Sequence, residues 1–369
     1  VSTSPTEANL VHSFEPDLIK QEVAETPSDA ELAHHSRRVE LHRWHLRLGH
    51  LSHAKLDEMA KTGIIPQRLS GIQPLKCASC TYGDMTRKPW RSKAAPRHIK
   101  PATKPGECVS VDQMVSTTPG FIAQLKSPVL TRRRYTVATV FVDHFSRLSY
   151  IYFQETQSSQ DTLTAKQAFE AYARDRGVKI QHYHADNGRF VDNLWQESIT
   201  KTGQTMTLCG VNAHHQNGIV EKRIRDLVGQ ARKMLLHAEA RWPKAVHTSL
   251  WPYALRTANE LHNSLQGRDN LSPSEKFSSV KVQPKLSDYH VFGCPVFALH
   301  NTLQAGSMLR RWEPRARLGL YLGPSPRHAR NVSLVLNLDT GLVSPQFHVS
   351  HDDFFETVED SRHKGASSW

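Results

Sequence analysis

The fold is decided by the stretch 135-YTVATVFVD-143, in which β-branched and aromatic residues predominate and an acidic residue closes the run. This composition is typical of a strand with at least one buried face. A shorter alternating stretch, 108-CVSVD-112, precedes it, and 148-LSYIYF-153 follows it. We therefore predict three consecutive strands, over residues 108–113, 135–143 and 148–153.

Helix and strand patterns alternate after the third strand. The apolar spacing predicts, in turn, a helix at 160–176, a strand at 178–185, a helix at 190–201, a strand at 205–209 and a long helix from about 218. Three strands followed by this alternation are the order of a ribonuclease-H-like α/β fold. The long helix carries an apolar stripe formed by Val220, Ile224, Leu227, Ala231 and Leu235. A second helix is expected at about 243–264.

The chain outside this α/β region has a different character. Residues 1–38 are acidic with few aromatics, which is typical of a disordered linker. A short helix is expected just after Ser52, which can cap it. After about residue 284, Gly and Pro separate short strand-like runs, which lie at 291–298, 315–322, 332–338 and 343–349. These runs predict a small β-rich domain.

The composition restricts the classes of function. The chain has 369 residues and a formal net charge of +12, a balance that favours a polyanionic partner such as nucleic acid. It has no run of about 18 apolar residues that could span a membrane, and no secretory leader. The five cysteines include one close pair, which indicates a reducing compartment and a metal site in preference to a disulfide framework. Because the chain begins with Val1, we expect it to be part of a longer polypeptide.

Three acidic residues have settings suited to metal-assisted chemistry: Asp112, Asp186 and Glu221. The two aspartates are expected at strand ends, and the glutamate in the first turn of the long helix, behind a potential cap at Asn217. Hard divalent ions prefer carboxylate oxygens. Two such ions about 3.5–4 Å apart can activate the attacking oxygen and stabilise the leaving oxygen of a phosphoryl transfer. We therefore predict these residues as catalytic ligands of two Mg²⁺ or Mn²⁺ ions.

Neighbouring titratable residues are less suited to that role. Asp143 ends the second predicted strand, but a hydrogen bond to the following turn through Ser146 is the simpler expectation. Glu107, His184 and Asp192 are close in sequence to the proposed ligands. We expect these three around the site or at the surface, without a direct bond to metal.

A second constellation combines His45, His50, Cys77 and Cys80. Two imidazoles and two thiolates make a closed tetrahedral Zn²⁺ site whose role is structural. A spacing of five places two side chains about 140° apart around an ideal helix, so the two histidines cannot both bind from one regular helix face. One must lie at a turn or helix end, and Gly49 offers that freedom. Two further histidines remain alternatives, His42 and His53.

Basic residues form a third feature. One face of the long helix carries Lys222, Arg223, Arg225, Arg232 and Lys233. Residues 86–105 are also basic, and a further group is formed by Arg310, Arg311, Arg315, Arg317, Arg327 and Arg330. We expect these residues to contact the phosphates of double-stranded DNA and to position it without reading its sequence. The sequence shows no aromatic–basic interleaving of the kind that single-strand binders use.

These motifs together resemble a known family. The segments 44-WHLRLGH-50 and 77-CASC-80 resemble the zinc-binding pre-integrase segment of copia-type (Pseudoviridae) LTR retrotransposons. The segments 142-VDHFSR-147, 186-DNG-188 and 216-QNGIVEK-222 resemble the integrase core that follows it, and 286-LSDYHVFGC-294 is similar to the segment after that core. The resemblance covers about residues 40–355.

The resemblance implies an integrase from a Gag-Pol polyprotein. Such an enzyme carries out 3′-end processing of element DNA and strand transfer into target DNA, with water as the first nucleophile and the DNA 3′-hydroxyl as the second. It implies multimers around two DNA ends, action in the nucleus and assembly in cytoplasmic virus-like particles. The metal-binding acids of the family correspond to Asp112, Asp186 and Glu221.

The resulting organisation has six parts. We predict a disordered acidic linker (1–38), a zinc-binding pre-integrase domain (39–90), a basic linker (91–106), an integrase catalytic core (107–280), a small β-rich DNA-binding domain (281–356) and a tail (357–369). Two alternatives remain open. One is a DNA-binding module that has lost catalysis, and the other is a cut-and-paste DNA transposase with the same acidic triad.

Overall fold

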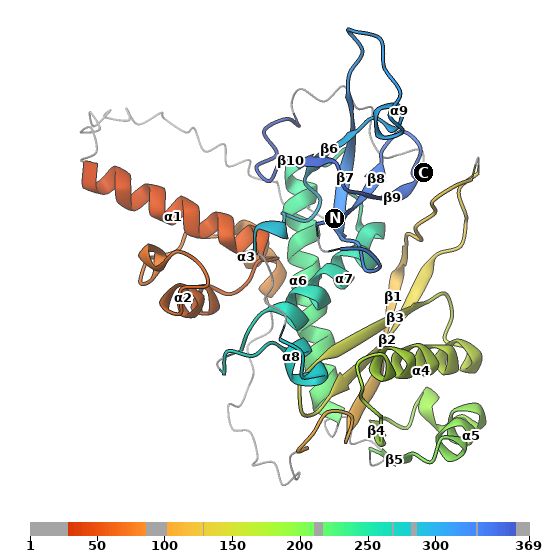
Figure 1. Ribbon diagram of the computed structural model, residues 1–369. Helices are drawn as coiled ribbons and strands as arrows, with labels where there is room; N and C mark the ends of the chain where they lie inside the picture. Colours follow the sequence, from red (N-terminus) through yellow and green to blue (C-terminus); the bar gives the residue numbers. More distant parts are fainter. Residues whose placement is uncertain are drawn as a thin grey trace, which may run out of the picture.

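The computed structural model describes residues 29–85, 102–127, 129–209, 217–267, 269–281, 286–329 and 331–358, with side chains from residue 34 onward. A long helix, α6 (Gly218–Arg241), runs through the molecule. The central sheet lies beside its amino-terminal half, and a second sheet and an N-terminal group of helices lie near its other end (Figure 1). The same helix therefore contacts all three parts.

The central sheet confirms the predicted ribonuclease-H-like fold. Its strands are β1 (Val109–Gly120), β2 (Tyr135–Asp143), β3 (Ser149–Gln154), β4 (His182–Ala185) and β5 (Thr205–Leu208). Their order is β3-β2-β1-β4-β5. The first three strands pair antiparallel, whereas β4 is parallel to β1 and β5 is parallel to β4. β1, which carries Asp112, is thus the central strand.

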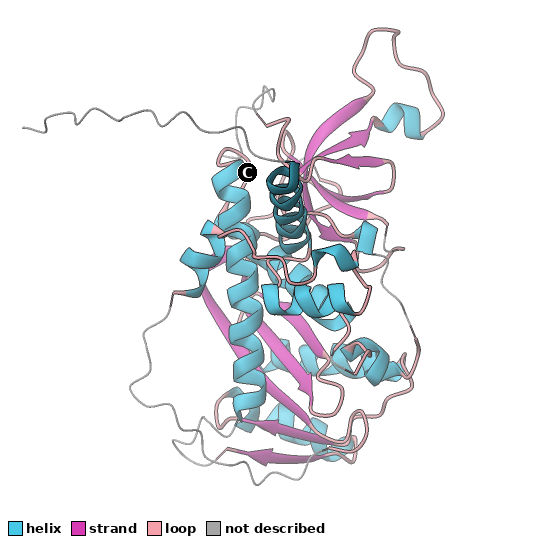
Figure 2. Ribbon diagram, turned by 90° about the vertical axis from the view of Figure 1, so that its left-hand side faces the viewer, coloured by secondary structure: helices cyan, strands magenta, loops and turns pink. Residues whose placement is uncertain are grey.

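Helices cover both faces of this sheet because its strands are apolar on both sides. On one face, Val111 and Phe141 pack against Phe169 of α4 (Ser159–Arg174), and α5 (Asn193–Lys201) extends this core. On the other face, Val140 and Val142 pack against α6 through Val220. Figure 2 shows α6 running along the sheet. The start of α6 therefore lies over the middle of the sheet.

Several element boundaries differ from the prediction. β1 continues to Gly120, so Asp112 lies inside the strand and not at its end. The polar run after residue 115 hid this extension. β4 begins at His182 and not at 178. The helix expected at 243–264 begins at Trp251, as α7 (Trp251–Ser264), because residues 242–250 form turns and a short 3₁₀ helix after α6.

The C-terminal sheet is antiparallel, as the β-rich prediction implies. It comprises β6 (Pro295–Leu299), β7 (Ala316–Pro324), β8 (Ser333–Asn337), β9 (Val343–Gln346) and β10 (Val349–His351), in the order β10-β6-β7-β8-β9. The single strand expected at 343–349 is divided between β9 and β10. Leu320 and Val335 of this sheet share one hydrophobic core with Ala254 of α7 and Leu235 of α6. One core thus spans the predicted boundary at 280/281.

The N-terminal helical segment (residues 29–85) contains α1 (Asp29–Arg47), α2 (His53–Lys61) and α3 (Ala78–Asp84). The predicted disordered linker 1–38 is therefore wrong for residues 29–38, which belong to α1, while residues 1–28 lie outside the described residues. The predicted cap of α2 is confirmed, since Ser52 Oγ accepts a hydrogen bond from Lys55 N. No helix among the described residues is both long enough and apolar enough to cross a bilayer.

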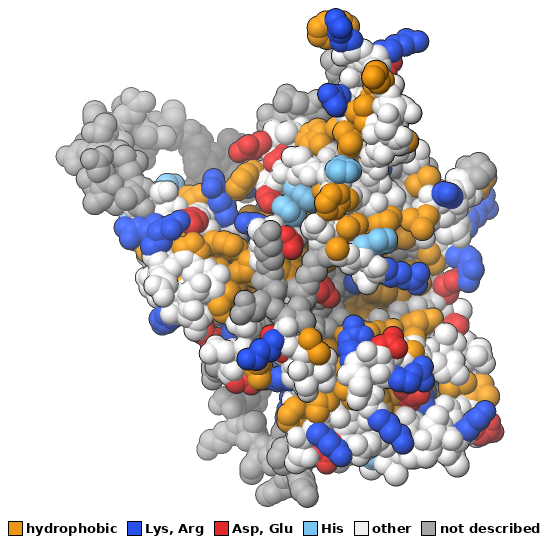
Figure 3. Space-filling view, in the orientation of Figure 1, with side chains coloured by type: hydrophobic (Ala, Val, Ile, Leu, Met, Phe, Trp, Pro, Cys, Tyr) orange, Lys and Arg blue, Asp and Glu red, His pale blue; other side chains and the backbone are white. Residues whose placement is uncertain are grey.

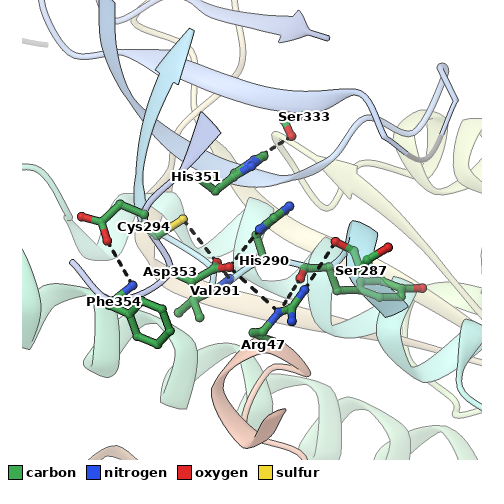
Figure 4. A network of polar contacts seen from close by, with 11 residues as sticks. Arg47, Ser287, His290, Val291, Cys294, Ser333, His351, Asp353 and Phe354 are labelled. Carbon is green, nitrogen blue, oxygen red and sulfur yellow. Dashed lines mark hydrogen bonds and ion pairs between the residues drawn. The ribbon is translucent and has the colours of Figure 1, made fainter. Parts of the chain in front are cut away.

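A polar network fastens this segment to the C-terminal sheet (Figure 4). Arg47 of α1 donates from Nε to the carbonyl oxygen of Tyr289 at 3.1 Å and lies 3.9 Å from the Asp353 carboxylate. Asp353 also accepts from Val291 N at 2.8 Å and contacts His290 Nδ1 at 3.0 Å. Because the network joins three segments distant in sequence, it holds α1 in a fixed position against the sheet.

Candidate active site and metal centre

Strand register brings the two predicted catalytic aspartates to neighbouring strands. Val111 pairs with Ala185 across the parallel β1–β4 ladder. Asp112 and Asp186 directly follow this pair. Alternation along each strand then places both carboxylates on the face away from Val111, which is the face that α6 covers.

The third acid comes from the first turn of α6. Asn217, just before the helix, is buried, and its Nδ2 donates to the carbonyl oxygen of Val111 at 3.0 Å. This contact fixes the start of the helix beside Asp112 and differs from the predicted role of Asn217 as a side-chain cap, which the structure does not show. Val220 packs on Val140 and Val142, and Glu221 follows it directly. The helix start thus delivers Glu221 to the aspartates.

Cys209 lies near the predicted acids. It follows β5, and its backbone N–H donates to the carbonyl oxygen of Ala185 at 2.9 Å. Burial raises the pKa of the Cys209 thiol, and the negative charges of Asp186, Glu221 and Asp112 each raise it further. Each of the three carboxylates is therefore close enough to influence this thiol. The sequence analysis did not identify Cys209. The signal that could have found it is the two-residue alternation along β5, which aligns Cys209 with Thr207.

Among the described residues, the three carboxylates are not part of any group whose potential ligand atoms all lie within 4.8 Å of one another. They are therefore less closely grouped than the four side chains of the His and Cys cluster.

The rival acids make hydrogen bonds within the protein, and the bond expected between Asp143 and Ser146 is confirmed. Asp143 is buried, and its Oδ2 accepts from both the backbone N–H and the hydroxyl of Ser146, at 2.7 and 2.6 Å. Burial raises its pKa. Glu107 accepts hydrogen bonds from Thr103. Asp192 caps α5 through Leu194 N.

The second predicted constellation forms a compact cluster. Potential ligand atoms of His45, His50, Cys77 and Cys80 all lie within 4.8 Å of one another. Cys80 Sγ is 3.2 Å from His45 Nε2 and 3.6 Å from His50 Nδ1, while Cys77 Sγ is 3.4 Å from His50 Nδ1. Tetrahedral zinc, with Zn–S of about 2.3 Å and Zn–N of about 2.0 Å, requires sulfur-to-nitrogen distances of about 3.5 Å. The four side chains therefore fit a zinc ion.

The backbone confirms how two histidines at a spacing of five converge. His45 lies in the last turn of α1, and the chain then turns through Gly49 (φ +63°) and His50 (φ 60°). This left-handed turn swings His50 back toward α1, as the helix geometry required. His42 and His53 are outside the cluster and pack with their rings on His45, at centroid distances of 5.6 and 4.6 Å.

The protonation of the cluster also suits metal binding. His45 Nδ1 is 2.8 Å from the carbonyl oxygen of Leu51, so Nδ1 carries the proton and Nε2 faces the thiols as an acceptor. Burial lowers the pKa of His50, which favours the neutral imidazole. The hydrogen bond from Cys80 lowers the pKa of the Cys77 thiol, whereas the same bond, together with burial, raises the pKa of the Cys80 thiol. Cys77 is thus the thiolate of the pair, and binding of Zn²⁺ would displace the proton that Cys80 keeps.

The predicted DNA-contact residues of α6 differ in their settings. Lys222 and Arg225 are exposed. Arg223 is half-buried, its Nη1 is 2.9 Å from His262 Nδ1, and burial lowers its pKa to about 10. Lys233 pairs with Asp84 of α3 at 2.7 Å. Arg223 and Lys233 therefore hold neighbouring elements and are poorly placed to meet phosphate.

The other basic groups fall partly outside the described residues. The residues that lie outside are 86–101 and Arg330. Four C-terminal arginines are exposed: Arg310, Arg311, Arg315 and Arg327. Arg317 is half-buried, and its Nε and Nη1 atoms have no hydrogen-bond partner in the part of the chain that the structure describes.

The chain is similar to several known proteins. Residues 21–85 match the family described as GAG-pre-integrase domain. The Retrovirus-related Pol polyprotein from transposon RE1 of Arabidopsis thaliana is 25% identical over 318 residues, covering 84% of this chain and 19% of that protein. The one from transposon TNT 1-94 of Nicotiana tabacum is 27% identical over 266 residues, covering 69% and 18%. The HTLV-2 integrase catalytic core domain in complex with magnesium is 16% identical, with a TM-score of 0.33, covering 47% of this chain and 97% of that chain.

The matches agree with the parts of the molecule described above. The matched family spans α1 to α3, which carry the His and Cys cluster. The match to the RE1 protein covers most of the chain, although the chain spans only about a fifth of that protein's length. These similarities support the interpretation of the chain as an integrase region of a copia-type LTR retrotransposon.

Proposed function

We propose that this region is a metal-dependent polynucleotidyl transferase that processes the 3′ ends of element DNA and joins them to target DNA. The observations that support the proposal are the β1–β4 register, which sets Asp112 beside Asp186, and the hydrogen bond from Asn217 to Val111, which sets the start of α6 beside β1. When bound, two Mg²⁺ or Mn²⁺ ions would stabilise the attacking and leaving oxygens of the phosphate.

In this proposal the protein side chains orient and do not react. Asp112, Asp186 and Glu221 would hold the ions through their carboxylate oxygens. The hydrogen bond from Asn217 to β1 keeps the helix-borne carboxylate in register with the strand-borne ones. The nucleophile comes from water or from a DNA 3′-hydroxyl, so the chain needs no nucleophilic side chain of its own.

The His and Cys cluster would hold one structural Zn²⁺ in this proposal. Four protein ligands leave no open position for a substrate. The cluster lies against α6, since Lys233 of that helix pairs with Asp84 of α3. The ion would therefore stabilise the helical segment at the end of α6 distant from the acids.

The partners follow from the same proposal. Double-stranded DNA would meet the exposed basic residues Lys222 and Arg225, which lie on α6 near Glu221. Because integration joins two element ends, we expect a homo-oligomer around two DNA duplexes. Action on chromosomal DNA implies work in the nucleus, after assembly in cytoplasmic particles.

The test is an oligonucleotide-joining assay with Mg²⁺ or Mn²⁺. Asp186→Asn should lower strand transfer by about a hundredfold or more, because each metal contributes several kcal/mol to the transition state. Asp226→Asn is the matched control, since Asp226 is exposed on α6 five residues after Glu221. It should retain wild-type activity. Joining by Asp186→Asn at the control rate would refute the assignment.

The same assay separates the enzyme from a DNA-binding module without catalysis. Wild-type protein that binds DNA in a salt-dependent way, yet forms no product with either ion, would favour the module. Binding and catalysis are measured on the same DNA, so the two outcomes are distinct.

A further inference from the structure

The feature that the proposed function leaves unused is the Trp312 turn, defined here as residues 308–315 between α9 (Asn301–Gln304) and β7. It projects beyond the C-terminal sheet at the top of Figure 1. Met308 is 94% exposed and Trp312 is 91% exposed. An indole ring is among the largest apolar groups, and such rings are enriched where partners bind. Its position outside the fold therefore indicates contact with another molecule.

The turn is built to present its tip. Glu313 N donates to the carbonyl oxygen of Arg310 at 3.1 Å, and Arg310 N donates to the Glu313 carboxylate at 3.3 Å. These reciprocal bonds close a tight turn with Arg311 and Trp312 at its two central positions. Pro314 follows and restricts the residue before it. The cation and the ring are thus displayed side by side.

The base of the turn is fixed to the sheet. His300 N donates to the carbonyl oxygen of Arg315 at 2.8 Å. Gln304 Nε2 donates to the carbonyl oxygen of Leu299 at 2.7 Å and to Gln346 Oε1 at 2.9 Å. A turn held at its base in this way positions the tip relative to the rest of the protein.

The charges around the ring indicate an anionic partner. Arg310, Arg311 and Arg315 are exposed. Glu313 is the single acid of the turn and lies 3.8 Å from Arg310 Nε, so the positive charges exceed the negative ones by two. At the top of Figure 3, hydrophobic and basic side chains lie together at this tip. The sequence analysis listed the arginines but did not predict their combination with an aromatic ring. This combination binds unpaired nucleic acid, because the cations meet phosphates and the ring stacks on a base.

We propose that the Trp312 turn binds unpaired nucleotides at a DNA end, with Trp312 stacked on a base and Arg310 and Arg311 on the flanking phosphates. The reason for an unpaired nucleotide is geometric. Inside a duplex both faces of each base are covered, and separating two steps costs energy. An unpaired base offers an open face. This proposal rests on the proposed function only for the choice of DNA as the anion.

The test compares two DNA probes without Mg²⁺ by fluorescence anisotropy. One is a blunt duplex, and the other is the same duplex with an unpaired tail that contains 2-aminopurine. Trp312→Ala should weaken binding to the tailed duplex by about tenfold and should leave the blunt duplex within about twofold. Stacking should quench 2-aminopurine with wild-type protein and not with Trp312→Ala, while Trp312→Phe should restore most of both effects.

Two further variants separate stacking from general effects. Phe347→Ala removes another exposed aromatic side chain of the same sheet, and it should bind both probes as the wild type does. The double variant Arg310→Gln, Arg311→Gln should weaken binding to both probes and lower the salt dependence by roughly 1.5–2 in log–log slope. Thermal melting should be unchanged in all of them, because each replaced side chain is exposed.

Failure of this proposal is distinguishable from failure of the proposed function. Wild-type protein that joins DNA, together with equal quenching and affinity in Trp312→Ala, would overturn the role of the turn alone. Absence of any DNA binding by wild-type protein would overturn both. Trp312-dependent binding to phosphatidylserine vesicles without an effect of the DNA tail would assign the turn to a membrane surface and also overturn the proposal.

Discussion

Replacement of Gly49 by Ala tests how closely the His and Cys cluster packs against α6 and α7. Gly49 precedes His50 of that cluster and has φ +63°. A Cβ atom added there would lie 2.6 Å from Leu261 Cδ1 on α7 and 2.9 Å from Gln230 Nε2 on α6. Both distances are shorter than atoms tolerate, so the helices or the turn must move.

The magnitude follows from two contributions. A non-glycine residue in the left-handed region costs about 1 kcal/mol. Overpacking against a buried side chain such as Leu261 adds about 1–3 kcal/mol. We therefore expect Gly49→Ala to lower the free energy of unfolding by about 2–4 kcal/mol, and to weaken metal retention because His45 and His50 lie on either side of the turn.

The N-terminal helical segment supplies a matched control. Gly71 has φ +70°, and a Cβ atom added there would meet nothing within 4 Å. Gly71→Ala should thus show only the backbone cost of about 1 kcal/mol. Guanidinium unfolding of both variants, followed by circular dichroism with zinc present, gives the difference. Equal unfolding midpoints for the two variants would refute the close contact with α6 and α7.

Three other perturbations probe different parts of the molecule. Lys166 is fully buried and pairs with Glu170 at 2.8 Å, so Glu170→Ala should cost about 3–5 kcal/mol in chemical unfolding by leaving an unpaired buried charge, whereas Lys166→Met should cost under about 1.5 kcal/mol. Burial lowers the pKa of His262 to about 4 and that of His351 to about 3. Because the unfolded value is about 6.5, their contribution to stability is present above about pH 6.5 and is lost as the pH falls through the folded values. The free energy of unfolding should therefore be lower at pH 5 than at pH 7.5. The difference between the two pH values should be smaller in the double variant His262→Gln, His351→Gln. Cys80→Ser should reduce bound zinc, measured by elemental analysis, from about one ion per chain to about a tenth or less; full retention of zinc would contradict the assigned ligand set.

The sequence was sufficient for the parts of the fold that depend on local patterns. Alternation of apolar residues predicted the strands around 135–143, and the Cys-x-x-Cys pair with two preceding histidines predicted the cluster at His45 and His50. Gly49 even indicated where the turn between them lies. These features depend on spacing along one segment, which a sequence displays directly.

Features that depend on register or on packing between distant segments were not predictable. Asn217 was expected to cap α6, but its side chain bonds to β1, because the sheet passes beside the helix start. Cys209 became relevant only when β5 paired with β4. Trp312 is a large apolar residue of the kind usually found in a core. Only the structure of its turn shows that it faces solvent.

The apolar core that α6 and α7 share with the C-terminal sheet has a practical consequence. If the chain were cut after α8 (Pro273–Ser278), residues such as Leu235 and Ala254 would lose the strands that shield them from water. A recombinant fragment limited to the α/β part would then expose an apolar surface and self-associate. Soluble expression of a fragment that carries Asp112, Asp186 and Glu221 should therefore require the C-terminal sheet as well.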